Sequence, residues 1–132
     1  MGCTMNDLIL THTAGAVRTL TLNRADKLNS FTRELHAALR VALDDAAADA
    51  AVRCVVITGA GRGFCAGQDL ADMELAAPLS PQLADLVGAY FNPLIRALHA
   101  FPKPILMAVN GVAAGAGANL ALAGDIDRKS VV

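Results

Sequence analysis

Two apolar runs, each followed by a glycine-rich turn, limit most strongly what this chain of 132 residues folds into. The first is "VRCVVITG", residues 52–59, and the second is "PILMAVN", residues 104–110. A continuous apolar run of this length is typical of a strand that is covered on both faces. We therefore expect both runs to be buried strands.

The segment before the first run predicts a hairpin and then a helix. Two short β-rich runs, residues 8–13 and 17–23, are separated by Ala14 and Gly15, which is typical of a hairpin. Thr32 is placed to cap the helix that follows. Apolar residues at helical spacing give that helix one buried face: Leu35, Leu39, Ala42, Leu43 and Ala46.

Two further helices are predicted beside the second run. One spans residues 78–101, with Ser80 as its cap and Pro81 in its first position, and Pro93 is expected to kink or break it. The glycine-rich segment 111–125 turns into the other helix. The alternation of strands and helices predicts one α/β layered domain.

The two ends of the chain are less regular. Residues 1–4 are interpreted as an extension before Met5, so the domain is expected over residues 5–126. Residues 127–132 stand where another strand is due, but "DRKS" is a poor continuation of one. We expect an atypical tail there, with a truncation, a reading-frame change and a natural terminus all left open.

Composition and charge exclude several functions. The formal net charge is −1 and no basic stripe is present, so nucleic-acid binding is not expected. No apolar stretch reaches the ~18–20 residues of a membrane span. Cys3, Cys54 and Cys65 are odd in number and lack the spacing of metal ligands, which disfavours a disulfide scaffold and a metal site. A reducing cytoplasm is the expected location.

The turn after the first run, "GRGFCAGQDL" at residues 61–70, fits two templates poorly. As a dinucleotide fingerprint it lacks the helix and the second strand that should follow at once. As a nucleophile elbow built on Cys65, it lies too far beyond the strand end near Thr58, and His99 is the only later histidine. Cys65 is therefore interpreted as a small apolar side chain that fills a turn.

In the third template, two glycine-rich turns aim backbone N–H groups at one point. The turns are "GFCAGQD" and "GVAAGAGA", and each follows a buried strand. Two converging N–H donors would form an oxyanion hole for a carbonyl oxygen. The alternative, that both turns are only tight connections, stays open at this point.

Three segments together resemble the crotonase (enoyl-CoA hydratase/isomerase) superfamily, and most of all its isomerase members. They are "VRTLTLNRADKLNSF", "VRCVVITGAGRGFCAGQDL" and "FPKPILMAVNGVAAGAGANLALAGDI". The resemblance implies a spiral of β-β-α turns, of which this chain would be the first half. It also implies an acyl-CoA thioester as substrate, with no separate cofactor, and assembly of the full-length protein as a homotrimer or a dimer of trimers.

The resemblance further implies the residues of the site. The N–H groups of Gln68 and Ala116 would hold the thioester oxygen. The residues lining the substrate would be Lys27, Leu28, Ala66, Gln68, Asp69, Leu70, Gly115 and Ala116, with Lys27 and Leu28 along the coenzyme A. Arg24, Lys27 and Arg62 would meet its phosphates or stay solvated, and both alternatives are open.

Two departures from the family pattern affect the expected chemistry. Hydratases of the superfamily have a glutamate where this chain has Asn119, and an asparagine cannot act as a general base. The remaining acid of the isomerase members would lie beyond residue 132, while Asp125 fits a structural position at the end of a helix. An inactive fragment is therefore expected.

The three histidines are not expected to be functional. His12, His36 and His99 have no partner at a spacing typical of a catalytic or metal site, and they are expected to be solvated or partly packed.

Overall fold

A five-stranded sheet forms the centre of the structure, a computed structural model that describes residues 5–72 and 79–129. In spatial order its strands are β1 (Ile9–Ala14), β2 (Val17–Leu22), β3 (Cys54–Gly59), β5 (Ile105–Val109) and β7 (Ile126–Lys129). The hairpin of β1 and β2 is antiparallel, and every other neighbouring pair is parallel. The expected α/β class is therefore confirmed.

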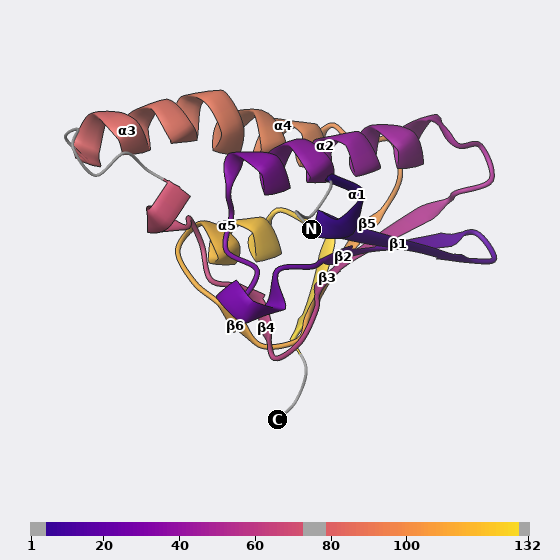
Figure 1. Cartoon of the computed structure of the whole chain (residues 1–132). Helices are drawn as coiled ribbons and strands as arrows, with labels where there is room; N and C mark the ends of the chain where they lie inside the picture. The colour runs from indigo at the N-terminus through magenta and orange to yellow at the C-terminus, as the bar shows by residue number, and fades with distance from the viewer. Residues whose placement is uncertain (1–4, 73–78, 130–132) are drawn as a thin grey trace.

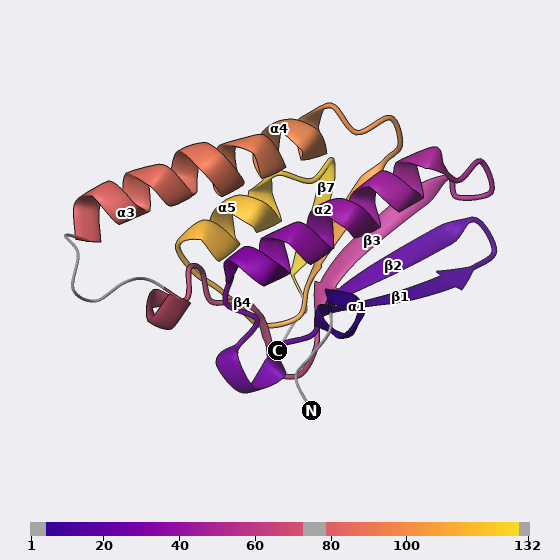
Figure 2. The ribbon, with the colours of Figure 1, turned by 45° about the horizontal axis from the view of Figure 1, so that its top comes forward.

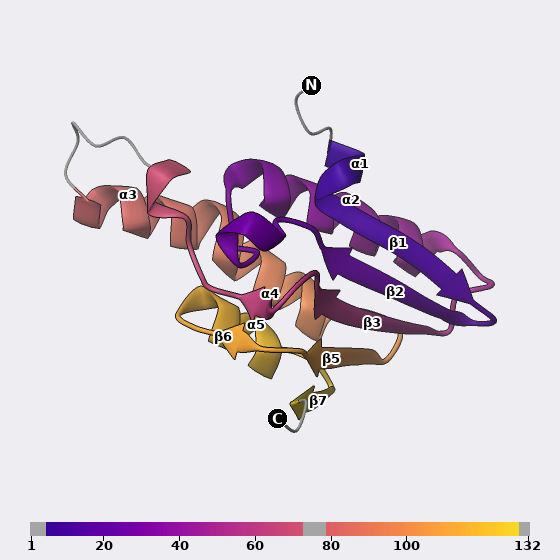
Figure 3. The same cartoon turned by 60° about the horizontal axis from the view of Figure 1, so that its bottom comes forward.

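The helices lie on one side of this sheet (Figures 1 and 2). They are α1 (Met5–Leu8), α2 (Arg33–Ala48), α3 (Leu79–Leu86), α4 (Asn92–His99) and α5 (Ala116–Leu122). Two single 3₁₀ turns are also present: η1 (Ala25–Lys27) lies between β2 and α2, and η2 (Leu70–Asp72) follows the first glycine-rich turn. Figure 3 shows the opposite face of the sheet, over which no described helix passes.

Within the described residues, one face of the two apolar runs is covered by helices and the other face is only partly covered. In β3, Val55 and Ile57 face the helices and are fully buried, whereas Val56 on the other face is only half-buried. The same alternation holds in β5, where Met107 is buried and Leu106 is half-buried. An apolar run marks a strand, but it does not reveal whether a second layer covers the far face.

The first long helix, α2, forms as expected. Thr32 is its cap, and the Thr32 hydroxyl accepts a hydrogen bond from the N–H of Leu35 at 3.1 Å. Glu34 lies in the first turn, where a negative charge is favoured. The predicted apolar face is buried except for Ala42, which is half-buried: Leu35, Leu39, Leu43 and Ala46.

The second long helix begins earlier than expected. It starts at Leu79, so Ser80 and Pro81 lie inside its first turn and Ser80 is not the cap. Pro93 does not break the helix: the backbone stays helical from Leu79 to His99, and the irregularity near Pro93 is a π-helical segment, η3 (Val87–Phe91), between α3 and α4. There the N–H of Asn92 donates to the carbonyl of Val87, five residues back.

Two other boundaries differ from the sequence expectation. The hairpin turn is Gly15-Ala16 rather than Ala14-Gly15, and Gly15 has a φ of +60°. Residues 127–129, expected to belong to an atypical tail, continue β7 beside β5. The proposed extension at residues 1–4 and the last three residues of the tail lie outside the described residues.

Candidate active site

The two glycine-rich turns lie against each other, because each contains a short strand and these two strands pair. They are β4 (Gly63–Cys65) and β6 (Val112–Ala113), and they run parallel. The N–H of Ala114 then donates to the carbonyl of Cys65 at 3.1 Å. Gly117 permits this approach, since a Cβ at that position would overlap the same carbonyl.

The backbone of Gln68 is held from both sides by Phe31. The N–H of Phe31 donates to the carbonyl of Gly67 at 2.7 Å, and the N–H of Asp69 donates to the carbonyl of Phe31 at 2.8 Å. The N–H of Gln68, between these two bonds, donates to no acceptor in the described part of the chain. Gln68 therefore presents a fixed and unused backbone donor.

Ala116 supplies a second unused donor. It is the first residue of α5, and the first N–H groups of a helix have no partner within the helix. Gly115 before it, with a φ of +55°, provides no side-chain cap. The two donors belong to touching turns: a Cβ at Gly67 would lie 3.6 Å from the nitrogen of Ala116. Among the described residues, no acceptor receives the N–H of Ala116.

The "DKLN" loop is hydrogen-bonded to the first of these turns. The N–H of Ala66 donates to the carbonyl of Leu28 at 3.0 Å. Leu28 and Asn29 have φ angles of +50° and +57°, a conformation that side chains rarely adopt. The side chain of Asn29 stabilises it, because its Nδ2 donates to the carbonyls of Ala60 and Gly63 and its Oδ1 accepts from the N–H of Arg24.

The carboxylate of Asp69 is part of an ion pair. Its Oδ2 lies 2.8 Å from the guanidinium of Arg24, which also donates to the carbonyl and the hydroxyl of Ser30. The other carboxylate oxygen accepts the N–H of Ala71. The hydrogen bond from Arg24 is the main cause that holds the pKa of Asp69 below its ordinary value. Arg24 is thus bonded within the turn, whereas Lys27 and Arg62 are exposed.

The thiol of Cys65 is unsuited to nucleophilic chemistry, as expected. Its side chain is fully buried, and burial raises its pKa to about 11. A thiol must be deprotonated to attack, so this group is inert at neutral pH. The interpretation of Cys65 as a packing residue is confirmed.

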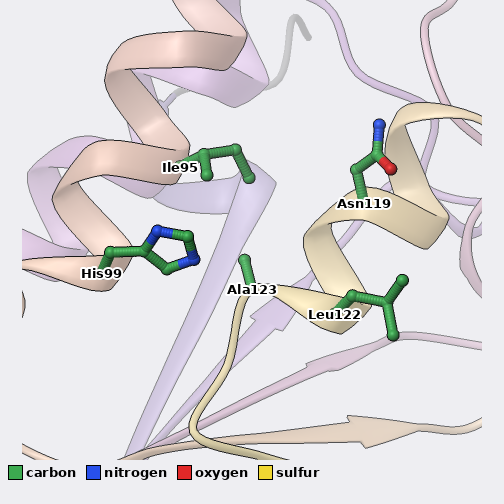
Figure 4. Close-up of a pocket in the computed structure, with 5 residues that line it drawn as sticks. All are labelled: Ile95, His99, Asn119, Leu122 and Ala123. Carbon is green, nitrogen blue, oxygen red and sulfur yellow. The ribbon is translucent and has the colours of Figure 1, made fainter.

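A pocket of about 340 Å³ lies between α4 and α5 (Figure 4). Its lining comes from both helices and is mainly apolar, with one imidazole and one amide: Ile95, His99, Asn119, Leu122 and Ala123. Asn119 is one helical turn after Ala116 and is exposed. Asp125 is not part of this pocket. Its carboxylate accepts the N–H of Ile105 at 2.8 Å, which confirms its expected structural position.

Two other features are absent from the described residues. Within residues 5–72 and 79–129, no three acidic, histidine or cysteine side chains are grouped so that they could hold a metal ion. In the same ranges, no helix has the length and apolar character that crossing a membrane requires.

Comparison with known proteins agrees with this geometry. The family model described as enoyl-CoA hydratase/isomerase matches residues 12–128. The chain belongs to the enoyl-CoA hydratase/isomerase family. It is 53% identical over 124 residues to the 1,2-epoxyphenylacetyl-CoA isomerase of Escherichia coli, covering 92% of this chain and 47% of that protein. It is 43% identical to a probable enoyl-CoA hydratase of Rhodobacter capsulatus, covering 81% of this chain and 40% of the relative.

Solved structures of the family show the same fold. An enoyl-CoA hydratase from Bacillus anthracis matches with a TM-score of 0.83 at 31% identity, covering 92% of this chain and 47% of the other. An enoyl-CoA hydratase/isomerase from Mycobacterium abscessus matches with a TM-score of 0.82 at 36% identity, covering 92% and 47%. The chain therefore has the N-terminal part of the crotonase fold, and it spans about half the length of the relatives it matches.

Sequence reasoning missed several residues that hold this family's glycine turns in place. Neither Asn29 nor Asn110 is among the site residues expected from the sequence, yet both bond to the first turn. His36 was expected to be solvated or partly packed, and this is wrong because its side chain is 2% exposed. The sequence signal for the burial of His36 was its position next to Leu35, on the apolar face of α2.

Proposed function

We propose that this chain binds an acyl-CoA thioester and holds the thioester oxygen between the N–H groups of Gln68 and Ala116. The observation that supports this best is that two unused backbone donors lie on two touching, fixed turns. When a thioester becomes an enolate, negative charge develops on its oxygen. Donors that already point at that position stabilise the charge without reorganising.

The surroundings of these donors suit the rest of such a ligand. Ala66 is half-buried and Leu70 is exposed beside Gln68, so both are available to the acyl group or the thioester. Gly115, exposed and without a side chain, leaves the approach to Ala116 open. We propose that Leu28, in its strained loop, contacts the coenzyme A.

Two exposed cations near this loop would meet the coenzyme A phosphates. Lys27 ends η1, and Arg62 follows Gly61, where an added Cβ would lie 3.0 Å from the Cβ of Ala25 in the same η1 turn. Arg24, in contrast, already bonds Asp69 and Ser30. We therefore assign phosphate contacts to Lys27 and Arg62 and not to Arg24.

For the full-length protein we propose isomerisation of an acyl-CoA through a thioester enolate. The name of the E. coli relative makes ring-1,2-epoxyphenylacetyl-CoA the first substrate to test, within phenylacetate breakdown. Hydration of an enoyl-CoA is the alternative, since several relatives are named probable enoyl-CoA hydratases. The homotrimer or dimer of trimers, too, stays a prediction for the full-length protein.

For this chain alone we propose binding without turnover. Asn119 provides no carboxylate on α5, and two carboxylates at the end of the first glycine turn are already bonded, Asp69 to Arg24 and Asp72 to the N–H of Arg33. Proton transfer by a positioned acid or base contributes about 10²–10⁴-fold to such reactions.

A pair of ligands that differ in one oxygen tests the proposed contact. Isothermal titration with hexanoyl-CoA and with its thioether analogue, S-hexyl-CoA, compares the same coenzyme and chain with and without the carbonyl. Two hydrogen bonds, each worth about 0.5–1.5 kcal/mol, should make the thioester bind roughly 5- to 150-fold more tightly. Equal affinities of the two ligands would refute the contact.

A further inference from the structure

The structure carries an aromatic cluster directly behind the proposed donor of Gln68, made of Phe31, His36, Tyr90 and Phe91. The ring of His36 stacks on that of Phe31, with centroids 4.2 Å apart and an interplanar angle of 15°. Phe91 meets His36 edge-on at 4.4 Å and Phe31 edge-on at 5.4 Å. Tyr90 lies tilted against His36 at 5.4 Å.

The imidazole of His36 contributes only its ring to this cluster. Neither Nδ1 nor Nε2 has a hydrogen-bond partner in the described part of the chain, although the side chain is 2% exposed. A buried polar group without a partner is costly, so the two nitrogens do not account for the placement of this residue. What His36 supplies is a flat ring that matches the ring of Phe31.

Phe31 connects this cluster to the candidate site. Its side chain is fully buried, and its backbone makes the two hydrogen bonds that bracket Gln68. His36 itself is fixed by the first turn of α2, where its N–H donates to the carbonyl of Thr32 at 3.0 Å. The backbone at Gln68 is thus bonded on both sides to Phe31, and the ring of Phe31 stacks on the ring of His36.

We propose that His36 is a positioning residue, which acts through Phe31 to hold the N–H of Gln68 toward the bound thioester oxygen. The proposal deepens the proposed function and rests on it. The π-helical segment η3 supports it from the other side, because it carries both Tyr90 and Phe91 onto the imidazole. Such segments occur often at functional sites.

Three variants separate stacking from general packing. His36→Phe keeps a flat ring and removes the two unpartnered nitrogens. His36→Leu keeps an apolar side chain of similar size but cannot stack. Leu43→Val, two turns further along α2 and equally buried, is the matched core control. Urea unfolding of all three confirms that each variant is folded.

The first readout needs no ligand. Amide hydrogen exchange of Phe31 and Asp69, followed by NMR, reports the two hydrogen bonds that bracket Gln68. Loss of one aromatic stack should speed exchange at these two amides by roughly three- to tenfold in His36→Leu. His36→Phe and Leu43→Val should leave them unchanged. Equal protection in His36→Leu, or equal loss in Leu43→Val, would overturn the proposal.

The second readout uses the ligand pair of the proposed function. The preference for hexanoyl-CoA over S-hexyl-CoA should shrink in His36→Leu and persist in His36→Phe, while the affinity for free coenzyme A stays the same. An unchanged preference in His36→Leu would overturn the positioning role. If the unaltered chain does not prefer hexanoyl-CoA over S-hexyl-CoA, the proposed function is wrong. The positioning role is then wrong as well, even if the hydrogen-exchange results show that His36 stabilises Phe31.

Discussion

Asn29 and Asn110 donate to the same carbonyl oxygen, that of Gly63, from Nδ2 atoms 2.9 and 3.2 Å away. Asn29 comes from the "DKLN" loop and Asn110 follows the end of β5. Two segments that are distant in sequence are therefore hydrogen-bonded to the same atom of the glycine-rich turn. Asn110 also accepts the N–H of Gly59 at 3.1 Å. The turn that carries Gln68 is thus part of the rigid core rather than a free loop.

Replacing Asn29 should therefore destabilise the protein strongly. Asn29→Ala removes three hydrogen bonds and places alanine at a φ of +57°, so we expect a loss of about 2–4 kcal/mol in the free energy of unfolding. Urea denaturation measures this loss. Asn92→Ala, at the exposed start of α4, is the control and should change stability by less than about 0.5 kcal/mol. A loss no larger in Asn29→Ala than in this control would contradict the role of Asn29.

Substitutions of Gln68 should separate its backbone from its side chain. Gln68→Ala keeps the N–H, and we expect it to retain most of the preference for a thioester over a thioether. Gln68→Pro deletes the N–H and should abolish much of that preference. In a full-length relative, the same loss of one donor should cost about 10²–10³ in turnover. Circular dichroism checks that the proline variant is folded, since its ring also restricts the backbone.

The thiol of Cys65 should be dispensable. With a pKa of about 11, roughly one thousandth of it is thiolate at pH 8, and it is fully buried. Cys65→Ser should bind hexanoyl-CoA with the affinity of the unaltered chain, as measured by titration calorimetry. If this variant folds but no longer binds the thioester, the thiol has a role that this account denies it.

His36 should make stability fall in mild acid. Burial lowers its pKa in the folded protein from 6.5 to about 4, so the unfolded chain takes up a proton first as the pH falls. Well above pH 6.5 both states are neutral and His36 has no effect. Between pH 6.5 and 4 its contribution becomes increasingly unfavourable, by up to about 3 kcal/mol.

The comparison with His36→Phe isolates this effect. Asp49 and Asp69 have lowered pKa values, so their contribution is present at neutral pH and is also lost in acid, but in both proteins alike. The difference in unfolding free energy between the two proteins, measured in urea from pH 7.5 to 4.5, should grow in favour of His36→Phe. A constant difference across this range would show that His36 takes up a proton in the folded state as readily as in the unfolded chain.

The sequence predicts the elements of this fold better than their environment. A local signal such as the Thr32 cap acts over a few residues and is confirmed. Cover of the far face of β3 depends on other parts of a chain, so the local pattern of the strand does not fix how deeply Val56 is buried. The same holds for the site. Glycine spacing suggests two turns, but their contact depends on β4 pairing with β6.

The stack of His36 on Phe31 illustrates what the sequence cannot reveal. The two residues are near in sequence, but Phe91, which completes the cluster, comes from a helix more than fifty positions later, and its approach depends on the π-helical segment. Hydrophobic periodicity in the sequence does not predict that the imidazole of His36 is buried without a hydrogen-bond partner among the described residues. Its burial follows from tertiary packing alone.

The infrared spectrum of a bound thioester tests the central claim most directly. Hexanoyl-CoA labelled with ¹³C at the carbonyl would be bound to the unaltered chain, and its C=O stretch compared with that of the free ligand in water. Two donors fixed at the oxygen should move the stretch to lower wavenumber, and Gln68→Pro should reverse much of that movement while Gln68→Ala should not. A bound thioester whose stretch matches the free ligand in water, or one that is indifferent to the loss of the Gln68 N–H, would contradict the claim that Gln68 and Ala116 hold this oxygen.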